Sequence, residues 1–264
     1  MPLIQTEAII LGSRKFSESS KIISVFTKDR GRISILVKGG RKGTKKFPGG
    51  LETLNRVEAQ IYQKSGRELQ NFKAADLVDA YPNLRKDLSL TYTALSLAET
   101  VERTTLPDDA HPDLFDTLAE SFWALNRTGL HPWTIRWRGL LGICRALGFG
   151  LTLEGCALCG KKRPMRAFSL VRGGFVCASC FKPDADTLAL PGEIWGVLRF
   201  LNSCPIQAAV RLKVLPLIGR RIETLFLMYF KYHIPGLKGF STWKALPQTY
   251  WGSKTDNSRE NQDG

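Results

Sequence analysis

The chain has 264 residues, of which 43% are hydrophobic, and its 38 Lys and Arg against 24 Asp and Glu give a formal net charge of +14. This length has room for about two domains, and the apolar content excludes a wholly disordered protein. The positive charge indicates an anionic partner, such as nucleic acid, anionic lipid or an acidic protein segment, and says nothing about the fold.

The N-terminal segment gives the first indication of the compartment. Residues 1–18 have no cationic lead and only a short apolar run, so they lack the form of a secretory signal. No stretch approaches the roughly 20 apolar residues that a membrane-spanning helix needs. We therefore expect a cytoplasmic protein, associated with the nucleoid if its partner is DNA.

The first 80 residues have the pattern of strands joined by tight turns. Residues rich in Ile, Val and Phe predict strands over 6–16, 21–27 and 32–38, and two further strands follow over 57–62 and 69–80. Five strands with a long loop between the third and fourth predict a barrel of the OB type over residues 1–80. An SH3-like barrel of the same size stays open on the pattern alone.

The pattern changes after Pro82, where apolar residues recur every three or four positions. This period predicts a helical domain over 81–252, so that the fold class is α+β with more than one domain. Pro112 is expected in the first turn of the second helix. The polar residues 253–264 are expected to form a disordered tail.

Two Cys-x-x-Cys pairs lie in the second half of the chain, Cys156 with Cys159 and Cys177 with Cys180, and 17 residues separate them. This spacing is typical of a zinc site, and the sequence around 172–174 predicts a hairpin that brings the pairs together. Four thiolates complete a tetrahedral shell, which predicts one structural Zn²⁺ in a zinc-ribbon-like insertion at about 155–183. The alternative is two independent redox or disulfide pairs, but the βαβ setting of a thioredoxin-like motif is missing.

No catalytic constellation stands out in the sequence. The loop at 37–50 has five cations, five glycines and no acid, but its glycine register does not match the P-loop pattern of nucleotide hydrolases. Asp113, Asp116 and Glu120 fit a solvated helix face better than a metal site. We therefore expect a binding protein without catalytic residues rather than an enzyme.

A small basic barrel commonly binds single strands, with cations along the phosphates and aromatic side chains on the bases. Phe16, Phe47 and Tyr62 are candidates for stacking, and each could instead pack in the core. For the loop at 37–50, the alternative is a flexible turn that only contacts water. The cations expected to contact nucleic acid are Arg14, Lys15, Arg30, Arg32, Lys38, Arg41, Lys42, Lys45 and Lys46.

Several segments, taken together and in order, resemble the RecO family of bacterial DNA repair proteins. They are TEAIIL, TKDRGRISILVKGGRK, GREL, LLGICRALGF, CALCG and FSLVRGGFVCASC. The resemblance covers about residues 5 to 240 and departs from the family at 16–20, which reads FSESS where the family often has Y-G-E-x-D. It implies an N-terminal OB fold, a helical domain with a zinc-binding insertion, and no enzymatic activity.

The resemblance also implies a recombination mediator of the RecFOR pathway in the DNA damage response. Such a protein binds single- and double-stranded DNA, anneals complementary strands and, with RecR, helps RecA to load on strands coated by single-stranded-DNA-binding protein. Whether RecF is a further partner stays open. Two other functions are weighed against this one: a nucleic-acid-modifying enzyme whose OB domain delivers substrate, and a scaffold that binds only proteins.

The tail of single-stranded-DNA-binding protein is expected to be acidic and apolar, which requires a cationic and aromatic surface. The third expected helix offers such side chains, and the alternative is a core helix whose arginines reach solvent. The residues concerned are Trp133, Arg136, Trp137, Arg138 and Arg145.

Overall fold

A computed structural model of the chain describes residues 2–39, 51–64, 66–127 and 131–246. The chain divides into two compact units, which are Met1–Asp87 with Ala94–Arg127, and Leu88–Thr93 with Thr128–Gly264. This division differs from the boundary predicted at residue 80, because most of one helix and all of the next group with the N-terminal strands. The predicted tail at 253–264 lies outside the described residues.

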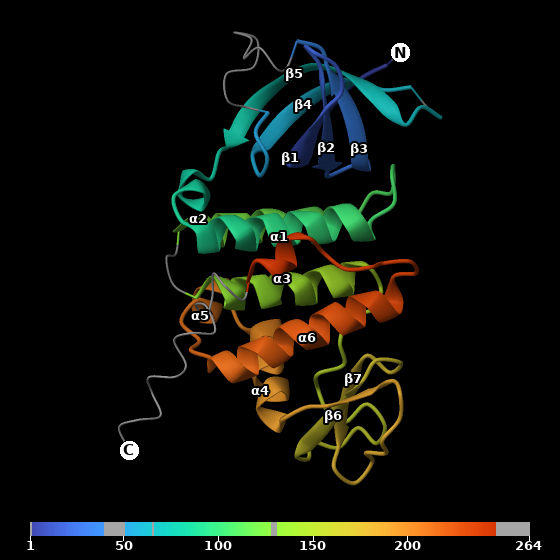
Figure 1. Cartoon of the computed structure of the whole chain (residues 1–264), viewed down its shortest axis with the longest axis vertical. Coiled ribbons are helices and arrows are strands. Elements are labelled where there is room, and N and C mark those ends of the chain that lie inside the picture. The colour runs from blue at the N-terminus through green and yellow to red at the C-terminus, as the bar shows by residue number, and fades with distance from the viewer. Residues whose placement is uncertain (1, 40–50, 65, 128–130, 247–264) are drawn as a thin grey trace. The chain divides into compact units, whose positions relative to one another are not determined.

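Five strands at the N-terminus form a closed barrel in the order β1-β2-β3-β5-β4 (Figure 1). The long strand β1 pairs with β4 through its first half and with β2 through its second, and its register shifts between Ile10 and Gly12. A short parallel pairing of β3 with β5 closes the barrel in the OB order, which confirms the predicted fold. The strands are β1 (Leu3–Lys15), β2 (Lys21–Thr27), β3 (Gly31–Val37), β4 (Arg56–Tyr62) and β5 (Leu69–Asp79).

The barrel core follows from the alternation of the strands. In β3 and β4 every second residue is buried, as the sequence predicted for β4, and Ile33, Ile35 and Ile61 are among the side chains that fill the interior. Each such aliphatic side chain contributes about 1.5–3 kcal/mol through burial. The residues between them are only partly buried, so they form the outer face of the sheet.

Three helical elements follow the barrel along the chain, namely η1 (Pro82–Arg85), α1 (Leu88–Thr104) and α2 (Pro112–Arg127). Pro112 begins α2, as predicted. In the N-terminal unit, Phe115 of α2 stacks on Phe26 of β2 with 6.4 Å between ring centroids, and Lys28 Nζ pairs with Asp116 Oδ1 at 2.8 Å. One of the three acids predicted to form a solvated face on α2 therefore makes an ion pair, and the three do not form a metal-ligating group among the described residues.

The C-terminal unit contains α3 (Pro132–Ala146), α4 (Gly192–Ser203), α5 (Ile206–Ala209), α6 (Pro216–His233) and η2 (Thr242–Lys244). Gly148 follows α3 with a φ of +85°, the left-handed conformation expected of a helix C-cap. Tyr229 of α6 donates a hydrogen bond of 2.9 Å to the carbonyl of Phe149 and so joins α6 to the end of α3. The sequence did not predict the short elements α5 and η2.

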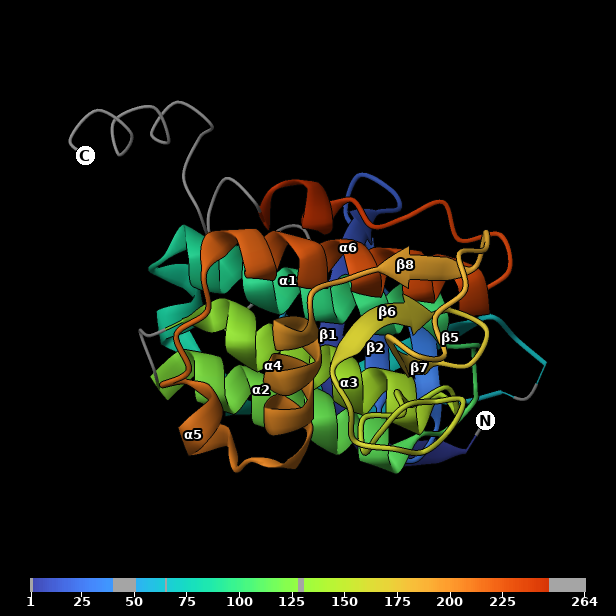
Figure 2. The same ribbon diagram turned by 90° about the horizontal axis from the view of Figure 1, so that it is seen from below.

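The cysteine segment folds as a small sheet of β6 (Met165–Ser169), β7 (Gly174–Cys177) and β8 (Thr187–Ala189). The order is β7-β6-β8, and all pairs are antiparallel (Figure 2). The predicted hairpin is therefore confirmed, while β8 was not predicted. Gly173 in the β6–β7 turn has a φ of +60°, and a Cβ there would lie 2.4 Å from the Tyr229 hydroxyl, so only glycine fits.

Candidate functional site

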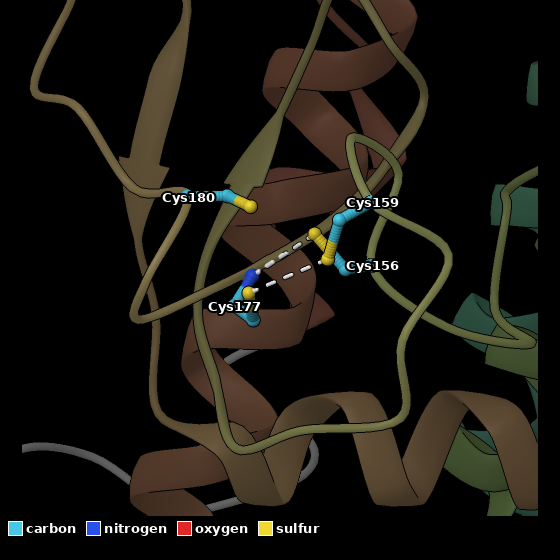
Figure 3. A group of neighbouring side chains, drawn as sticks. All are labelled: Cys156, Cys159, Cys177 and Cys180. Carbon is cyan, nitrogen blue, oxygen red and sulfur yellow. Dashed lines mark hydrogen bonds between the residues drawn. The ribbon is translucent and has the colours of Figure 1, made fainter.

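The four cysteines predicted as metal ligands converge on one point (Figure 3). One pair precedes β6, while the other consists of the last residue of β7 and the turn after it, so the hairpin brings the two pairs together. Their sulfur atoms all lie within 4.8 Å of one another, and Cys159 Sγ is 3.9 Å from Cys177 Sγ. This is the only group of metal-ligating side chains found in the described part of the chain, and it could hold one metal ion.

The backbone around the quartet favours the thiolate form of Cys156. Burial alone would raise the pKa of this thiol, but backbone N–H groups of Cys177, Cys159 and Leu158 outweigh burial and lower the pKa to about 6. The N–H of Cys177 lies 3.4 Å from Cys156 Sγ. The Cys180 thiol donates hydrogen bonds to the sulfurs of Cys159 and Cys177, which raises its pKa to about 12, because four close sulfurs cannot all ionise without a cation between them.

The predicted DNA-contacting cations on the barrel are largely accessible. Arg14, Lys15, Arg30 and Lys38 are exposed. Arg32 is half-buried, and its Nε and Nη2 donate to the carbonyl oxygen of Thr105 at 3.4 and 3.3 Å. The remaining cations of this prediction, Arg41, Lys42, Lys45 and Lys46, lie outside the described residues.

Two of the aromatic side chains predicted to stack on bases are accessible. Phe16, in the β1–β2 connection, is 58% exposed, and Tyr62, at the end of β4, is 37% exposed. Neither therefore packs fully in the core, which was the alternative in the sequence. Phe47 lies outside the described residues.

The predicted peptide-binding residues on α3 do not form one surface. Arg136 and Trp137 have no exposed surface, so the prediction that they contact a peptide is wrong. Both donate to Glu223 Oε1 on α6, at 2.6 Å from Arg136 Nη1 and 2.6 Å from Trp137 Nε1. The other three differ in exposure: Arg145 is exposed, and Trp133 and Arg138 are half-buried.

A hollow that was not predicted from the sequence lies on the outer face of the barrel. It has a volume of about 340 Å³, and its lining includes Ser24, Ser34 and Glu102 beside the predicted Arg14 and Arg32. The sequence holds a partial signal for it, because one outward position on each of β2 and β3 is a serine, Ser24 and Ser34. Glu102 of α1 could not be predicted as part of this hollow, because no pattern in the sequence places residue 102 beside β1.

The fold and the site define a class of protein. An OB-type barrel carries accessible cations, and the chain continues into helices and a hairpin whose four cysteines could hold a metal ion. The described helices include none that is long and apolar enough to cross a membrane. The class is that of proteins with an OB-type barrel, a helical region and a hairpin insertion that could hold a metal ion.

Comparison with known proteins identifies the family. Residues 1–81 match the family profile "Recombination protein O N terminal", and residues 85–239 match "Recombination protein O C terminal". The chain is 27% identical over 237 residues to the DNA repair protein RecO of Anaeromyxobacter sp. strain K, covering 89% of this chain and 92% of that protein. It is 32% identical over 206 residues to DNA repair protein RecO of Geobacter sulfurreducens, covering 75% and 82%. The chain belongs to the RecO family, and its role therefore lies in DNA repair and recombination.

Proposed function

We propose that this chain is a recombination mediator that binds single- and double-stranded DNA and anneals complementary strands. In this proposal it works with RecR at the nucleoid and helps RecA to load on strands coated by single-stranded-DNA-binding protein. The observation that carries the proposal is the closed OB barrel with exposed cations in a chain of the RecO family. The protein acts by binding alone, with no covalent change to the DNA.

The physical basis of annealing is the approach of two polyanions. Each strand carries condensed counterions, and a cationic surface that replaces them lowers the repulsion between strands and releases the ions into solution. The net charge of +14 supplies such a surface without any chemical step. DNA affinity should consequently fall steeply as the salt concentration rises.

The metal in the cysteine quartet is proposed to be one structural Zn²⁺. In a tetrahedral site with Zn–S bonds of about 2.3 Å, neighbouring sulfurs are about 3.8 Å apart. The distance of 3.9 Å between Cys159 Sγ and Cys177 Sγ fits this geometry, and a set of four sulfur donors suits a soft or borderline cation. Bound there, the ion would hold the two ends of the hairpin together.

The tail of single-stranded-DNA-binding protein is proposed to bind at the accessible part of α3. Arg145 is exposed there, and its guanidinium is oriented by a hydrogen bond to Asn202 of α4. With Trp133 and Arg138 this leaves a smaller cationic surface than the sequence predicted. Arg145→Ala should weaken binding of a tail peptide, and an unchanged affinity would remove this placement.

The proposed DNA binding is tested by removing the cations of the basic loop. Replacing Arg41, Lys42, Lys45 and Lys46 by Ala should lower affinity for oligonucleotides of different sequence by similar factors. The slope of log K against log salt for single strands should become shallower by about 0.7 for each phosphate that the variant no longer neutralises. Fluorescence anisotropy at several salt concentrations measures both quantities.

A control variant that loses the same charge elsewhere distinguishes DNA contact at the basic loop from attraction by the overall positive charge. Arg211, Lys213, Arg221 and Lys231 are exposed in the C-terminal unit, and their replacement by Ala also removes four cations. The control should reduce affinity and slope much less than the loop variant. Equal effects of the two variants would contradict binding at the loop, and a wild-type protein that binds no DNA would favour the protein-only scaffold.

A further inference from the structure

A row of very small residues crosses three neighbouring strands on the outer face of the barrel. Gly12 of β1 pairs with Ser24 of β2, and Ser24 pairs with Ser34 of β3, so the three lie side by side. Because side chains alternate between faces, Ser24 and Ser34 point away from the apolar core that contains Ile23 and Val25, and Gly12 lies beside them without a side chain. The row is the floor of the hollow of about 340 Å³.

An arginine stands near each end of this floor. Arg14 pairs with Ile22, and Arg32 pairs with Phe26, so their positions are four residues apart along β2, or about 13 Å. Both side chains line the hollow. The side chain of Arg14 makes no ion pair or hydrogen bond within the described part of the chain, while the guanidinium of Arg32 is oriented by its contact with the Thr105 carbonyl. Two guanidinium groups at opposite ends suit two separate phosphates better than one.

The middle of the hollow has a different chemistry. A Cβ on Gly12 would lie 3.9 Å from Glu102 Oε2, which places this carboxylate over the small-residue floor. The Glu102 carboxylate forms no ion pair or hydrogen bond with the described residues, and Ser24 Oγ is buried without a partner among them. A carboxylate repels phosphate and accepts from N–H or O–H groups, so the middle favours a neutral group that carries donors.

We propose that this hollow seats one nucleotide of single-stranded DNA, with its base against Glu102 and Ser24. In this arrangement Arg14 and Arg32 contact the phosphates on the two sides of that nucleotide. The site discriminates little between bases, because all four carry hydrogen-bond donors and a flat face. The inference rests on the proposed DNA binding and adds to it the position and the unit that is recognised.

The test is to fill the hollow without changing its charge. Ser24→Val with Ser34→Val adds bulk at the floor, and valine suits a strand. Affinity for an oligothymidylate should fall about tenfold, the scale of one or two lost hydrogen bonds to charged groups, while the salt slope stays unchanged.

A second variant, Arg14→Ala, should instead lower affinity and make the salt slope shallower by about 0.7. Lys73→Ala, which removes an exposed cation of β5 outside the hollow, is the matched control for Arg14 and should change neither affinity nor slope markedly.

Competitor binding distinguishes a strand from a free anion and needs no variant. A thymidine trinucleotide phosphorylated at its 5′ end carries phosphates on both sides of an internal nucleotide, and it should compete about tenfold better than thymidine monophosphate. Inorganic phosphate should compete least. The proposal would be overturned if the three competitors displaced DNA equally well at equal concentrations of negative charge. It would also be overturned if the Ser24→Val, Ser34→Val variant kept both the melting temperature and the DNA affinity of the wild type. That second result would leave the proposed function standing if the loop variant still lost affinity.

Discussion

The guanidinium of Arg136 is the most buried charge among the described residues of the C-terminal unit. It has no exposed surface, it pairs with the carboxylate of Glu223, and it lies 4.0 Å from the centroid of the Trp243 ring. Trp137 donates to the same carboxylate. These contacts join α3, α6 and η2 through one charged group, so we assign Arg136 to stability rather than to partner binding.

Removal of this guanidinium should destabilise the protein strongly. Arg136→Ala leaves Glu223 largely buried without its cation, and the loss of one partner of a buried ion pair costs about 3–5 kcal/mol. Arg138→Ala, on the same helix but half-buried, should cost much less. Urea unfolding measures both free energies. If both variants lost a similarly small free energy of unfolding, the Arg136 ion pair would contribute little to stability.

At the residue scale, sequence reasoning succeeds where spacing alone determines a site. The four cysteines could be named because Cys-x-x-Cys pairs create a metal site largely by local geometry. Arg136 could not be placed, because α3 is buried on most of its sides, including Ile135, Gly139 and Ile143, and so has no simple amphipathic pattern. Its partner Glu223 is 87 residues away, a pairing that no local signal reveals.

At the scale of elements, the cysteine hairpin depends on ligands at both of its ends. Apart from them, β6 and β7 form a short pair, and a small hairpin is only marginally stable in water. A bound metal ion would tie Cys156 and Cys159 to Cys177 and Cys180, which closes the loop between them. We therefore expect the order of this segment to depend on the metal.

Loss of one ligand should release the ion and loosen only this element. Cys159→Ser should lower the metal content well below one ion per chain and raise hydrogen exchange over β6 and β7, because metal binding is coupled to local folding. Cys204→Ala, at a buried cysteine outside the quartet, should keep its metal. Elemental analysis and exchange mass spectrometry provide the two measurements. Unchanged metal content in Cys159→Ser would contradict the four-ligand site.

Helices and strands could be predicted from the sequence where their hydrophobic pattern is long and regular. The alternation in β4 and the three- or four-residue period in α2 come directly from burial on one face. The strand β8 has three residues and the helix α5 has four, which is too short for either period to be visible. The hollow on the barrel depends on which strands are neighbours, so it became visible only with the sheet register.

At the scale of the whole molecule, the charge is unevenly distributed along the chain. Residues 1–80 carry a net charge of +7, whereas residues 81–155 carry −2. The remaining residues, 156–264, carry +9, so the positive charge lies at both ends of the chain. The first segment includes the barrel and the basic loop, so part of the attraction for a polyanion coincides with the fold that commonly binds single strands. This coincidence, together with family membership, supports DNA as the polyanion.

The measurement that tests the central claim most directly is strand annealing by the purified protein. Two complementary oligonucleotides, one with a fluorophore and one with a quencher, are mixed without nucleotide or added divalent metal. We predict that the protein accelerates quenching, that the effect fades as salt rises, and that both strands are recovered intact. No acceleration under conditions where both strands bind would contradict the mediator function, and cleaved or modified strands would show an enzyme instead.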